Sequence, residues 1–178
     1  MTFEDLGLSP ALLSAIADAG YEKPTPIQEG AIPVALTGRD VLGIAQTGTG
    51  KTASFTLPMI ERLSRGRARA RMPRSLVLAP TRELAIQIHR DAQTLGKATD
   101  LKLGLVYGGT GYHEQREGLA GGVDVLIGTP GRLIDYYKQQ VFDLKAVQVV
   151  VLDEADRMFD LGFIKDIRYI LRRMPPPR

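Results

Sequence analysis

The sequence contains no cysteine, no tryptophan and only two histidines, His89 and His113. Without cysteine the chain forms no disulfide and no thiolate metal site, and two histidines far apart in sequence do not suggest a metal centre. It also lacks an apolar run of the roughly 18 residues that a membrane-spanning helix requires. The segment Met1–Asp5 is acidic where a signal peptide is basic. We therefore expect a cytoplasmic protein with no membrane partner.

The composition is typical of a globular domain with a full core. Of the 178 residues, 44% are hydrophobic and 24% are charged, and this length suits one domain covering residues 1–178. The net charge of +3 and the pI near 9.3 permit binding to nucleic acid but do not by themselves argue for it.

Two helices are predicted near the amino terminus. Ser9 is a suitable N-cap before a proline, and Gly20 is a suitable stop for the first helix. Thr25 and Gln28 have the spacing of a capping box, in which each side chain bonds the other residue's backbone N–H. The second helix is expected to end near Thr37.

A glycine-rich stretch then has the pattern and context of a phosphate-binding loop. The apolar segment Asp40–Ile44 before it fits a buried strand, and Ala53–Leu57 after it fits a helix. Its glycines let backbone N–H groups point inward, and the helix start adds partial positive charge. The general pattern has glycine at the first position, where this chain has alanine, so an ordinary glycine-rich turn is the alternative. The candidate residues are Ala45, Gln46, Thr47, Gly48, Thr49, Gly50, Lys51 and Thr52.

Four later segments are rich in valine, leucine and isoleucine and are separated by helical patterns. Nearly continuous apolar strands of this kind indicate a mostly parallel sheet with helices on both faces, the α/β class. Loops that follow such strands meet at one edge of the sheet, where ligands bind. The predicted strands are Ser75–Ala79, Leu103–Tyr107, Val123–Ile127 and Val147–Leu152.

Two acids follow the last of these strands. Asp153 is placed to hold Mg²⁺ together with Thr52, and Lys51 would contact the β- and γ-phosphates. Glu154 points elsewhere, because neighbouring side chains diverge at a strand end, and it can orient a water for attack on the γ-phosphate. Lys51, Asp153 and Glu154 are therefore the candidate catalytic residues. The alternative is that the acids only oppose the dipole of a following helix.

Asp153–Asp156 spells D-E-A-D, and the chain resembles the amino-terminal RecA-like domain of a DEAD-box ATP-dependent RNA helicase. Ala45–Thr52 is similar to the family's motif I, in which alanine in the first place is usual. Gly20–Gln28 resembles the Q motif, and Pro80–Ala85 resembles motif Ia. Gly108-Gly109 resembles the GG element and Thr129–Arg132 resembles motif Ib. The stretch Val123–Met174 is most similar to bacterial enzymes of the RhlB and RhlE kind.

The resemblance implies a P-loop NTPase that uses ATP and Mg²⁺. Gln28 would bond the adenine edge, Tyr21 would stack on the adenine, and Phe3 would brace that arrangement. The capping-box interpretation of Gln28 stays open, because the sequence does not say whether its amide faces the helix or the base.

The same resemblance implies contacts to the backbone of one RNA strand. Helix N-termini and paired glycines bind phosphate without reading bases, so we expect RNA binding that tolerates many sequences. A plain strand–turn–helix junction is the alternative for the motif Ib segment. The implied RNA-binding residues are Pro80, Thr81, Arg82, Gly108, Gly109, Thr129, Pro130, Gly131 and Arg132.

The chain departs from the family at its carboxyl end. A helical segment is expected over Met158–Arg178, and the sequence then stops before the family's Ser-Ala-Thr motif and second RecA-like domain. The resemblance places the Ser-Ala-Thr strand between Asp40–Ile44 and Val147–Leu152, so we expect an empty slot or a rearranged sheet there. Because arginine fingers contribute on the order of 10³–10⁵ in rate, we also expect very slow ATP hydrolysis by the chain alone.

Three interpretations remain open. Six arginines between Arg62 and Arg74 most simply form a solvated connection, and a contact with nucleic acid or a protein partner is the sharper hypothesis. A small-molecule kinase would share the phosphate loop, although Glu154 beside the metal acid suits water activation. A non-catalytic module that binds nucleotide, RNA or a protein is the third possibility.

Overall fold

The computed structural model describes residues 2–36, 51–63, 73–95, 101–109, 114–115, 119 and 122–174. The chain packs as two compact units, which are treated separately below. The first comprises Met1–Gly66 and Arg90–Leu101, and the second comprises Arg67–His89 and Lys102–Arg178. The expectation of one domain over residues 1–178 stays a prediction.

The first unit is helical. Ser9 accepts a hydrogen bond from the N–H of Leu12, and Gly20 has a left-handed φ of +87° after the first helix, so both predicted helix ends are confirmed. Its elements are η1 (Phe3–Leu6), α1 (Pro10–Asp18), α2 (Pro26–Leu36) and α3 (Lys51–Leu63). They enclose an apolar core made of Phe3, Leu6, Leu8, Leu12, Ile16, Ile32, Leu57, Ile60 and Leu95.

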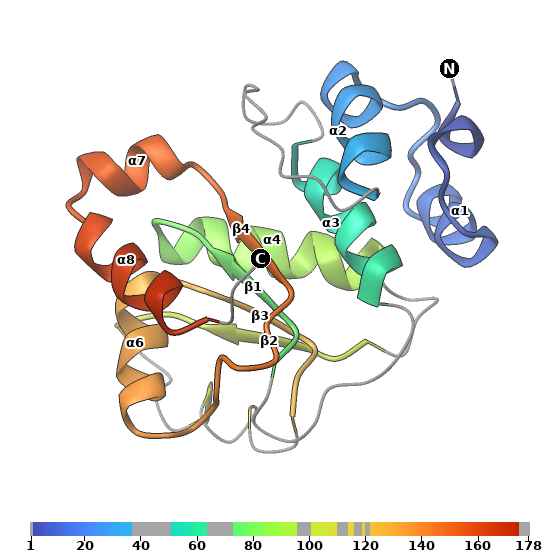
Figure 1. The fold of residues 1–178 in the computed structure, drawn as a ribbon. Helices are drawn as coiled ribbons and strands as arrows, with labels where there is room; N and C mark the ends of the chain where they lie inside the picture. The colour runs from blue at the N-terminus through green and yellow to red at the C-terminus, as the bar shows by residue number, and fades with distance from the viewer. Residues whose placement is uncertain are drawn as a thin grey trace. The chain divides into compact units, whose positions relative to one another are not determined.

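The second unit is built on a parallel sheet, which confirms the predicted strand type (Figure 1). The described strands have the order β2-β3-β1-β4. Register pairs Val77 with both Ile127 and Val151, so the three strands end at the same level. The strands are β1 (Ser75–Leu78), β2 (Leu103–Val106), β3 (Val125–Gly128) and β4 (Val149–Leu152).

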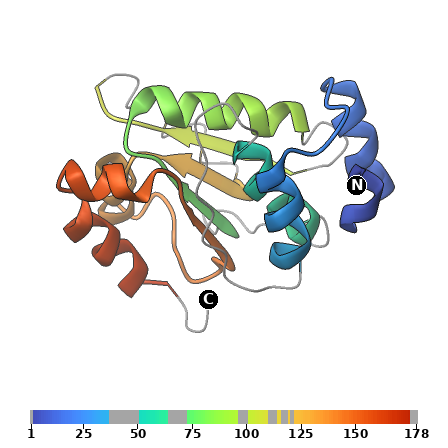
Figure 2. The same cartoon turned by 90° about the horizontal axis from the view of Figure 1, so that it is seen from above.

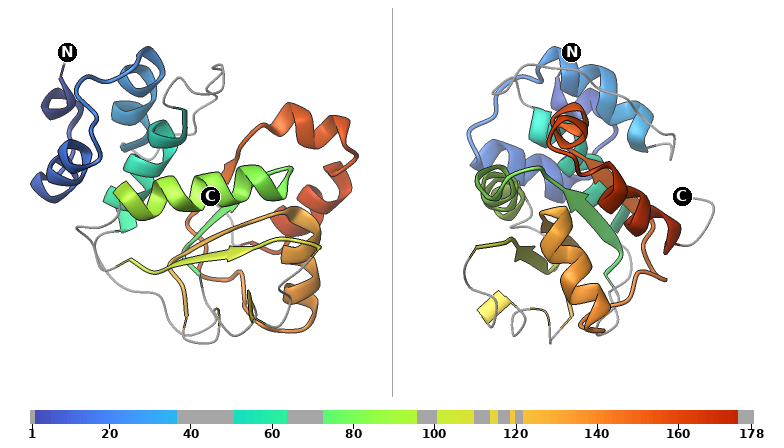
Figure 3. Two further views of the ribbon diagram at one scale, coloured as in Figure 1. Left: turned by 180° about the vertical axis from the view of Figure 1, so that it is seen from behind. Right: turned by 90° about the vertical axis from the view of Figure 1, so that its left-hand side faces the viewer.

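Helices cover both faces of this sheet. In the right-hand view of Figure 3, α6 (Pro130–Lys138) and α8 (Ile164–Arg172) lie on one face. The first half of α4 (Arg82–Leu95) lies on the other, and Figure 2 shows the same layering from above. Alternation along the strand places Leu76 and Leu78 in the core with α6 and α8, while Val77, which is also buried, points to the opposite face.

β4 is the strand on which the expectation of an empty slot depends. It forms one edge of the sheet that the structure describes, and its four residues are half-buried, whereas those of β1 and β3 are fully buried. The predicted strand Asp40–Ile44 lies outside the described residues. The empty slot therefore stays a prediction.

Arg74 corrects the interpretation of the arginine-rich segment. It is 7% exposed and its Nη1 lies 3.5 Å from Oδ1 of buried Asp124, rather than in a solvated connection. Asp124 also accepts from the N–H of Lys102 at 2.9 Å, and the Arg74 carbonyl accepts from the N–H of Gln148 at 2.8 Å. This ion pair ties the starts of the strands together. Arg62 is exposed on α3, and Arg65 to Arg71 lie outside the described residues.

The prediction of one continuous helical segment over Met158–Arg178 was wrong. The chain forms α7 (Ala155–Asp160) and α8, which are separated by a turn. Gly162 in that turn has a φ of +85°, a conformation that glycine adopts without the steric cost of a Cβ, and it ends the first helix. Residues 175–178 lie outside the part that the structure describes.

Gly128 at the end of β3 has no room for a side chain. A Cβ added at Gly128 would lie 2.5 Å from the carbonyl oxygen of Val106. A Cβ added at Gly131 would have no such neighbour within 4 Å. We predict that Gly128→Ala lowers the free energy of unfolding by about 1–3 kcal/mol, because backbone must move. Gly131→Ala, in the first turn of α6, should be neutral or slightly stabilising. Urea denaturation of both variants tests this, and equal stability would contradict it.

Candidate functional site

The ends of the four described strands carry the loops that the sequence analysis singled out. Backbone hydrogen bonds continue the ladder past the strands: Ala79 N–H donates to the Gly128 carbonyl at 3.0 Å, and Asp153 N–H donates to the Leu78 carbonyl at 3.0 Å. Thr129 N–H donates to the carbonyl of Val106 at 3.2 Å. The loops after β1, β2, β3 and β4 are therefore held side by side at one edge.

The two acids after β4 occupy different environments, as expected. Asp153 is 4% exposed, whereas the Glu154 side chain is 23% exposed with its carboxylate 3.6 Å from Nη1 of Arg157. Glu154 is the N-cap of α7 with left-handed backbone angles, φ 53° and ψ 50°. A non-glycine residue in that region costs free energy, and such strain clusters at functional sites. The acids do lie at the start of a helix, and their catalytic role stays a prediction.

The motif Ia arginine lies against the GG element. The Arg82 guanidinium carbon is 5.9 Å from the ring centroid of Tyr107, the residue before the two glycines. A Cβ on Gly109 would lie 3.6 Å from Nη1 of Arg82, and Gly109 has a φ of +101° that favours glycine. Thr81 caps α4 by accepting from the N–H of Leu84 at 3.2 Å. The structure thus brings together Arg82 and the two glycines.

Motif Ib begins helix α6. Thr129 is its N-cap with no side-chain capping bond, and Pro130 occupies the first helical turn. Arg132, half-buried, directs Nη1 to the Tyr136 hydroxyl at 3.4 Å and to Oε1 of Gln115, also at 3.4 Å. That Gln115 oxygen accepts from Tyr107 N–H at 2.9 Å. The two loops that resemble RNA-binding motifs are thereby joined.

Tyr107 and Gln115 are functional candidates that the sequence reasoning missed. Both residues lie outside the motifs on which the family resemblance is based, and a single glutamine forms no recognisable sequence pattern. Tyr107 directly precedes Gly108-Gly109, and this position was the available signal. Gln115 becomes recognisable only in space, through the two bonds that it accepts.

Beside these residues lies an open groove of about 310 Å³, bounded by the edge strand β2. Burial of His89 on its wall lowers the pKa of the imidazole, which favours its neutral form. The described lining residues are His89, Leu103, Gly104, Leu105, Tyr107, Glu114, Gln115 and Leu119.

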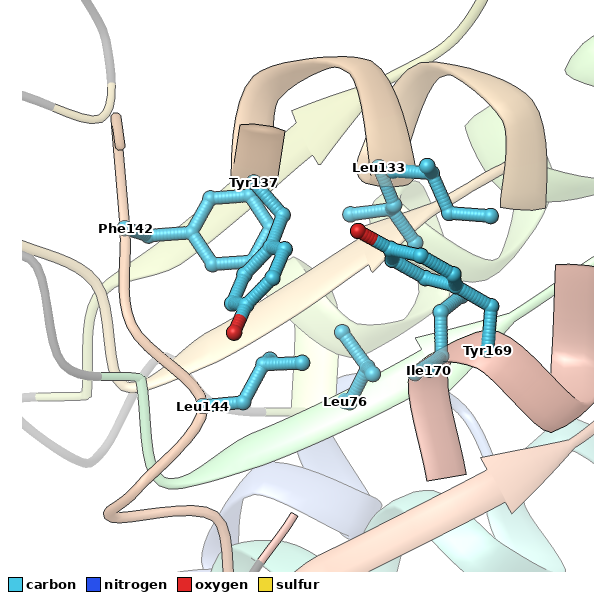
Figure 4. Close-up of a pocket in the computed structure, with 8 residues that line it drawn as sticks. Leu76, Leu133, Tyr137, Phe142, Leu144, Tyr169 and Ile170 are labelled. Carbon is cyan, nitrogen blue, oxygen red and sulfur yellow. The ribbon is translucent and has the colours of Figure 1, made fainter. Parts of the chain in front are cut away.

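A smaller pocket lies against the sheet between α6 and α8 (Figure 4). None of its described lining residues is charged, and all of them are aliphatic or aromatic. Figure 4 shows the rings of Tyr137, Phe142 and Tyr169 around it, and Tyr137 and Tyr169 meet edge-on with centroids 6.3 Å apart. The other lining residues are Leu76, Leu133, Ile134, Leu144 and Ile170. This pocket belongs to the core packing.

The candidate adenine-binding residues lie in the first unit. Gln28 is 2% exposed, and its Oε1 accepts from Thr25 N–H at 2.9 Å while its own N–H donates to the Thr25 hydroxyl at 3.4 Å. The capping box is therefore formed. Phe3 is buried and stacks on Tyr21 with centroids 6.4 Å apart, and Tyr21 is 37% exposed. Burial, followed by the charge of Asp91, raises the pKa of Tyr21.

The phosphate-loop residues Ala45 to Gly50 lie outside the described residues. Lys51 and Thr52 open α3, as the predicted loop-to-helix transition requires, although their side chains are not described. Lys51 and Asp153 belong to different units. Their joint role at one triphosphate stays a prediction.

These features define the class of protein, and comparison with known families agrees. Residues 25–178 match the family model described as DEAD/DEAH box helicase, so the chain belongs to this family. The chain is 57% identical to the ATP-dependent RNA helicase RhlB of Idiomarina loihiensis, over 98% of this chain and 42% of that protein. It is 58% identical to RhlB of Klebsiella pneumoniae, with the same coverage.

Among solved structures, the chain is similar to a DEAD box protein from the hyperthermophile Methanococcus jannaschii. The TM-score is 0.89 and the identity is 39%, over 98% of this chain and 47% of the other. The expected RecA-like α/β fold is thereby confirmed. The chain spans less than half the length of the curated relatives it matches. No helix in the described part of the chain is long and apolar enough to cross a membrane.

The left-handed backbone of Glu154 predicts an unusual order of stability. At this position Glu154→Gly should be more stable than Glu154→Ala by about 1 kcal/mol, because alanine keeps a Cβ in the strained conformation. Asp156 is the control, since it lies within α7, and there the alanine variant should be the more stable by about 1 kcal/mol. Urea denaturation measures all four variants. The same order at both positions would contradict the prediction.

Proposed function

We propose that the whole protein is an ATP-dependent RNA helicase and that this chain is its ATP- and RNA-binding half. Hydrolysis of ATP would be coupled to local unwinding of RNA duplexes when a second RecA-like domain is present. The observation that carries the proposal is the joining of Arg82, the two glycines and Arg132 at the sheet edge where Asp153 also lies. Family membership supports it.

ATP would be held by the phosphate loop and by the Q motif. Backbone N–H groups of the loop and Lys51 would bind the phosphates, with Tyr21 stacked on the adenine and braced by Phe3. Gln28 accepts a hydrogen bond in the capping box through its Oε1. Its side-chain NH₂ group would therefore be the part that bonds the base. A site that bonds the base through buried polar groups discriminates strongly against other bases.

Asp153 and Thr52 fit Mg²⁺ by their chemistry, since both offer oxygen ligands. No group of three or more histidine or acidic side chains that could hold a metal occurs among the described residues. Mg²⁺ in nucleotide enzymes is commonly held by one or two protein ligands together with the phosphates, and it neutralises their charge when bound. Asp153 would hold it from a buried position, and the more exposed Glu154 would orient the attacking water.

RNA would lie along the edge formed by the loops after β1, β2 and β3. The starts of α4 and α6 supply backbone N–H groups, and the glycines permit close approach of the sugar-phosphate chain. These groups meet phosphates and not base edges, so binding would tolerate many sequences. We also propose a cytoplasmic location, because such an enzyme needs the compartment that supplies RNA and ATP.

The alternative is a binding module without turnover. It concerns this chain by itself, which covers 42% of the length of RhlB from Idiomarina loihiensis. RNA-stimulated ATP hydrolysis by the chain at the rate of a two-domain helicase would exclude this alternative. Binding of ATP and RNA with negligible hydrolysis would support it.

We predict that Lys51→Ala weakens ATP binding at least tenfold, because a charge-assisted hydrogen bond to phosphate is lost. Titration with a fluorescent ATP analogue in the presence of Mg²⁺ measures the dissociation constant. Lys165→Ala, on the exposed side of α8, is the matched control and should leave it unchanged. An unaltered dissociation constant for Lys51→Ala would remove the phosphate loop from the proposal.

The two roles of Gln28 can be separated by comparing it with its capping partner. Thr25→Ala and Gln28→Ala should each destabilise the protein by about 1 kcal/mol, because each removes a capping bond. Only Gln28→Ala should also reduce the preference for ATP over GTP. The ratio of the two dissociation constants measures this preference. If the ratio changes equally in both variants, the adenine contact is absent.

A further inference from the structure

A single side-chain oxygen links the two loops that are proposed to bind RNA. Oε1 of Gln115 accepts from the backbone N–H of Tyr107 at 2.9 Å and from Nη1 of Arg132 at 3.4 Å. Tyr107 directly precedes Gly108-Gly109, and Arg132 lies in the first turn of α6, within the Thr129–Arg132 motif. The acceptor therefore bonds the main chain before the glycine loop and the cation at the start of α6.

The chemistry of this link suits phosphate binding. An amide oxygen carries no net charge, so it orients the Arg132 guanidinium without itself neutralising the positive charge that a phosphate would meet. Tyr136, fully buried, supports the same guanidinium from below, with its ring centroid 5.7 Å away and its hydroxyl 3.4 Å from Nη1. The tyrosine and the neutral acceptor therefore both help to position the arginine.

The other loop is held in a similar way. Gln115 holds the backbone of Tyr107 through a hydrogen bond. The guanidinium carbon of Arg82 lies over the Tyr107 ring, 5.9 Å from its centroid. Both cations are thus positioned relative to one residue. Adjacent phosphates of a nucleic acid strand have a set spacing, so cations held at a set spacing lose less entropy when they bind it.

We infer that Gln115 is a positioning residue for RNA binding, which holds Arg132 and the Gly108-Gly109 loop at the separation that one RNA strand requires. The inference rests on the proposed RNA-binding function. It adds a residue that lies outside the motifs on which that function was proposed.

The test is a double-mutant cycle in the full chain. Gln115→Met keeps the length of the side chain and removes the acceptor. The probe is a fluorescently labelled single-stranded oligouridylate, with Mg²⁺ and a non-hydrolysable ATP analogue present. Gln115→Met should weaken binding about threefold to tenfold, the range for one lost hydrogen bond. In an Arg132→Ala background the same change should weaken it less than about twofold, because the group it positions is already gone.

A second readout separates positioning from general damage. The slope of log affinity against log salt reports the number of phosphate contacts, so Gln115→Met should lower the slope towards that of Arg132→Ala. Gln139→Met, at the exposed end of α6, is the matched control and should change neither affinity nor slope. Thermal unfolding of each variant identifies any that do not fold.

The outcomes are distinguishable. If Gln115→Met has no effect, or weakens binding equally with and without Arg132, the inference about Gln115 is overturned while RNA binding stands. If Arg132→Ala binds the oligonucleotide as tightly as the unaltered chain, the proposed RNA site fails, and this inference fails with it.

Discussion

The hydrogen bonds between parallel strands β3, β1 and β4 are the interaction on which the candidate site depends. Parallel pairing places every carboxyl end at the same edge, and the ladder continues one residue beyond the strands through Ala79 and Asp153. Residues more than 70 positions apart in sequence thereby become neighbours. At the amino-terminal ends of the strands, the buried ion pair of Arg74 and Asp124 holds the strand starts together.

Asp153 and Glu154, which follow β4, differ in how deeply they are buried. Asp153 ends in the protein interior, where a carboxylate is stable only with partners such as hydrogen bonds or a cation. Glu154 turns away through a left-handed backbone step that costs energy in an ordinary loop. This change of backbone direction separates the two adjacent carboxylates, to which the proposed function assigns a metal and a water respectively.

At the proposed RNA-binding edge, some contact groups are placed by the backbone and others by neighbouring side chains. Helix starts and glycines supply contacts by backbone geometry, whereas Arg82 and Arg132 depend on the side chains around them for their placement. Tyr107, Tyr136 and Gln115 provide that support from three separate elements or loops. The likeness to known DEAD-box proteins covers the fold that creates this edge.

Local sequence determined the strand type, the helix caps at Ser9 and Gly20, and the family, because apolar runs, capping residues and motif spacing act over a few residues. It did not determine the fate of Arg74 or the role of Gln115, since a buried ion pair and a shared acceptor depend on partners far along the chain. Tertiary structure decided these features because their energies arise between elements and not within them.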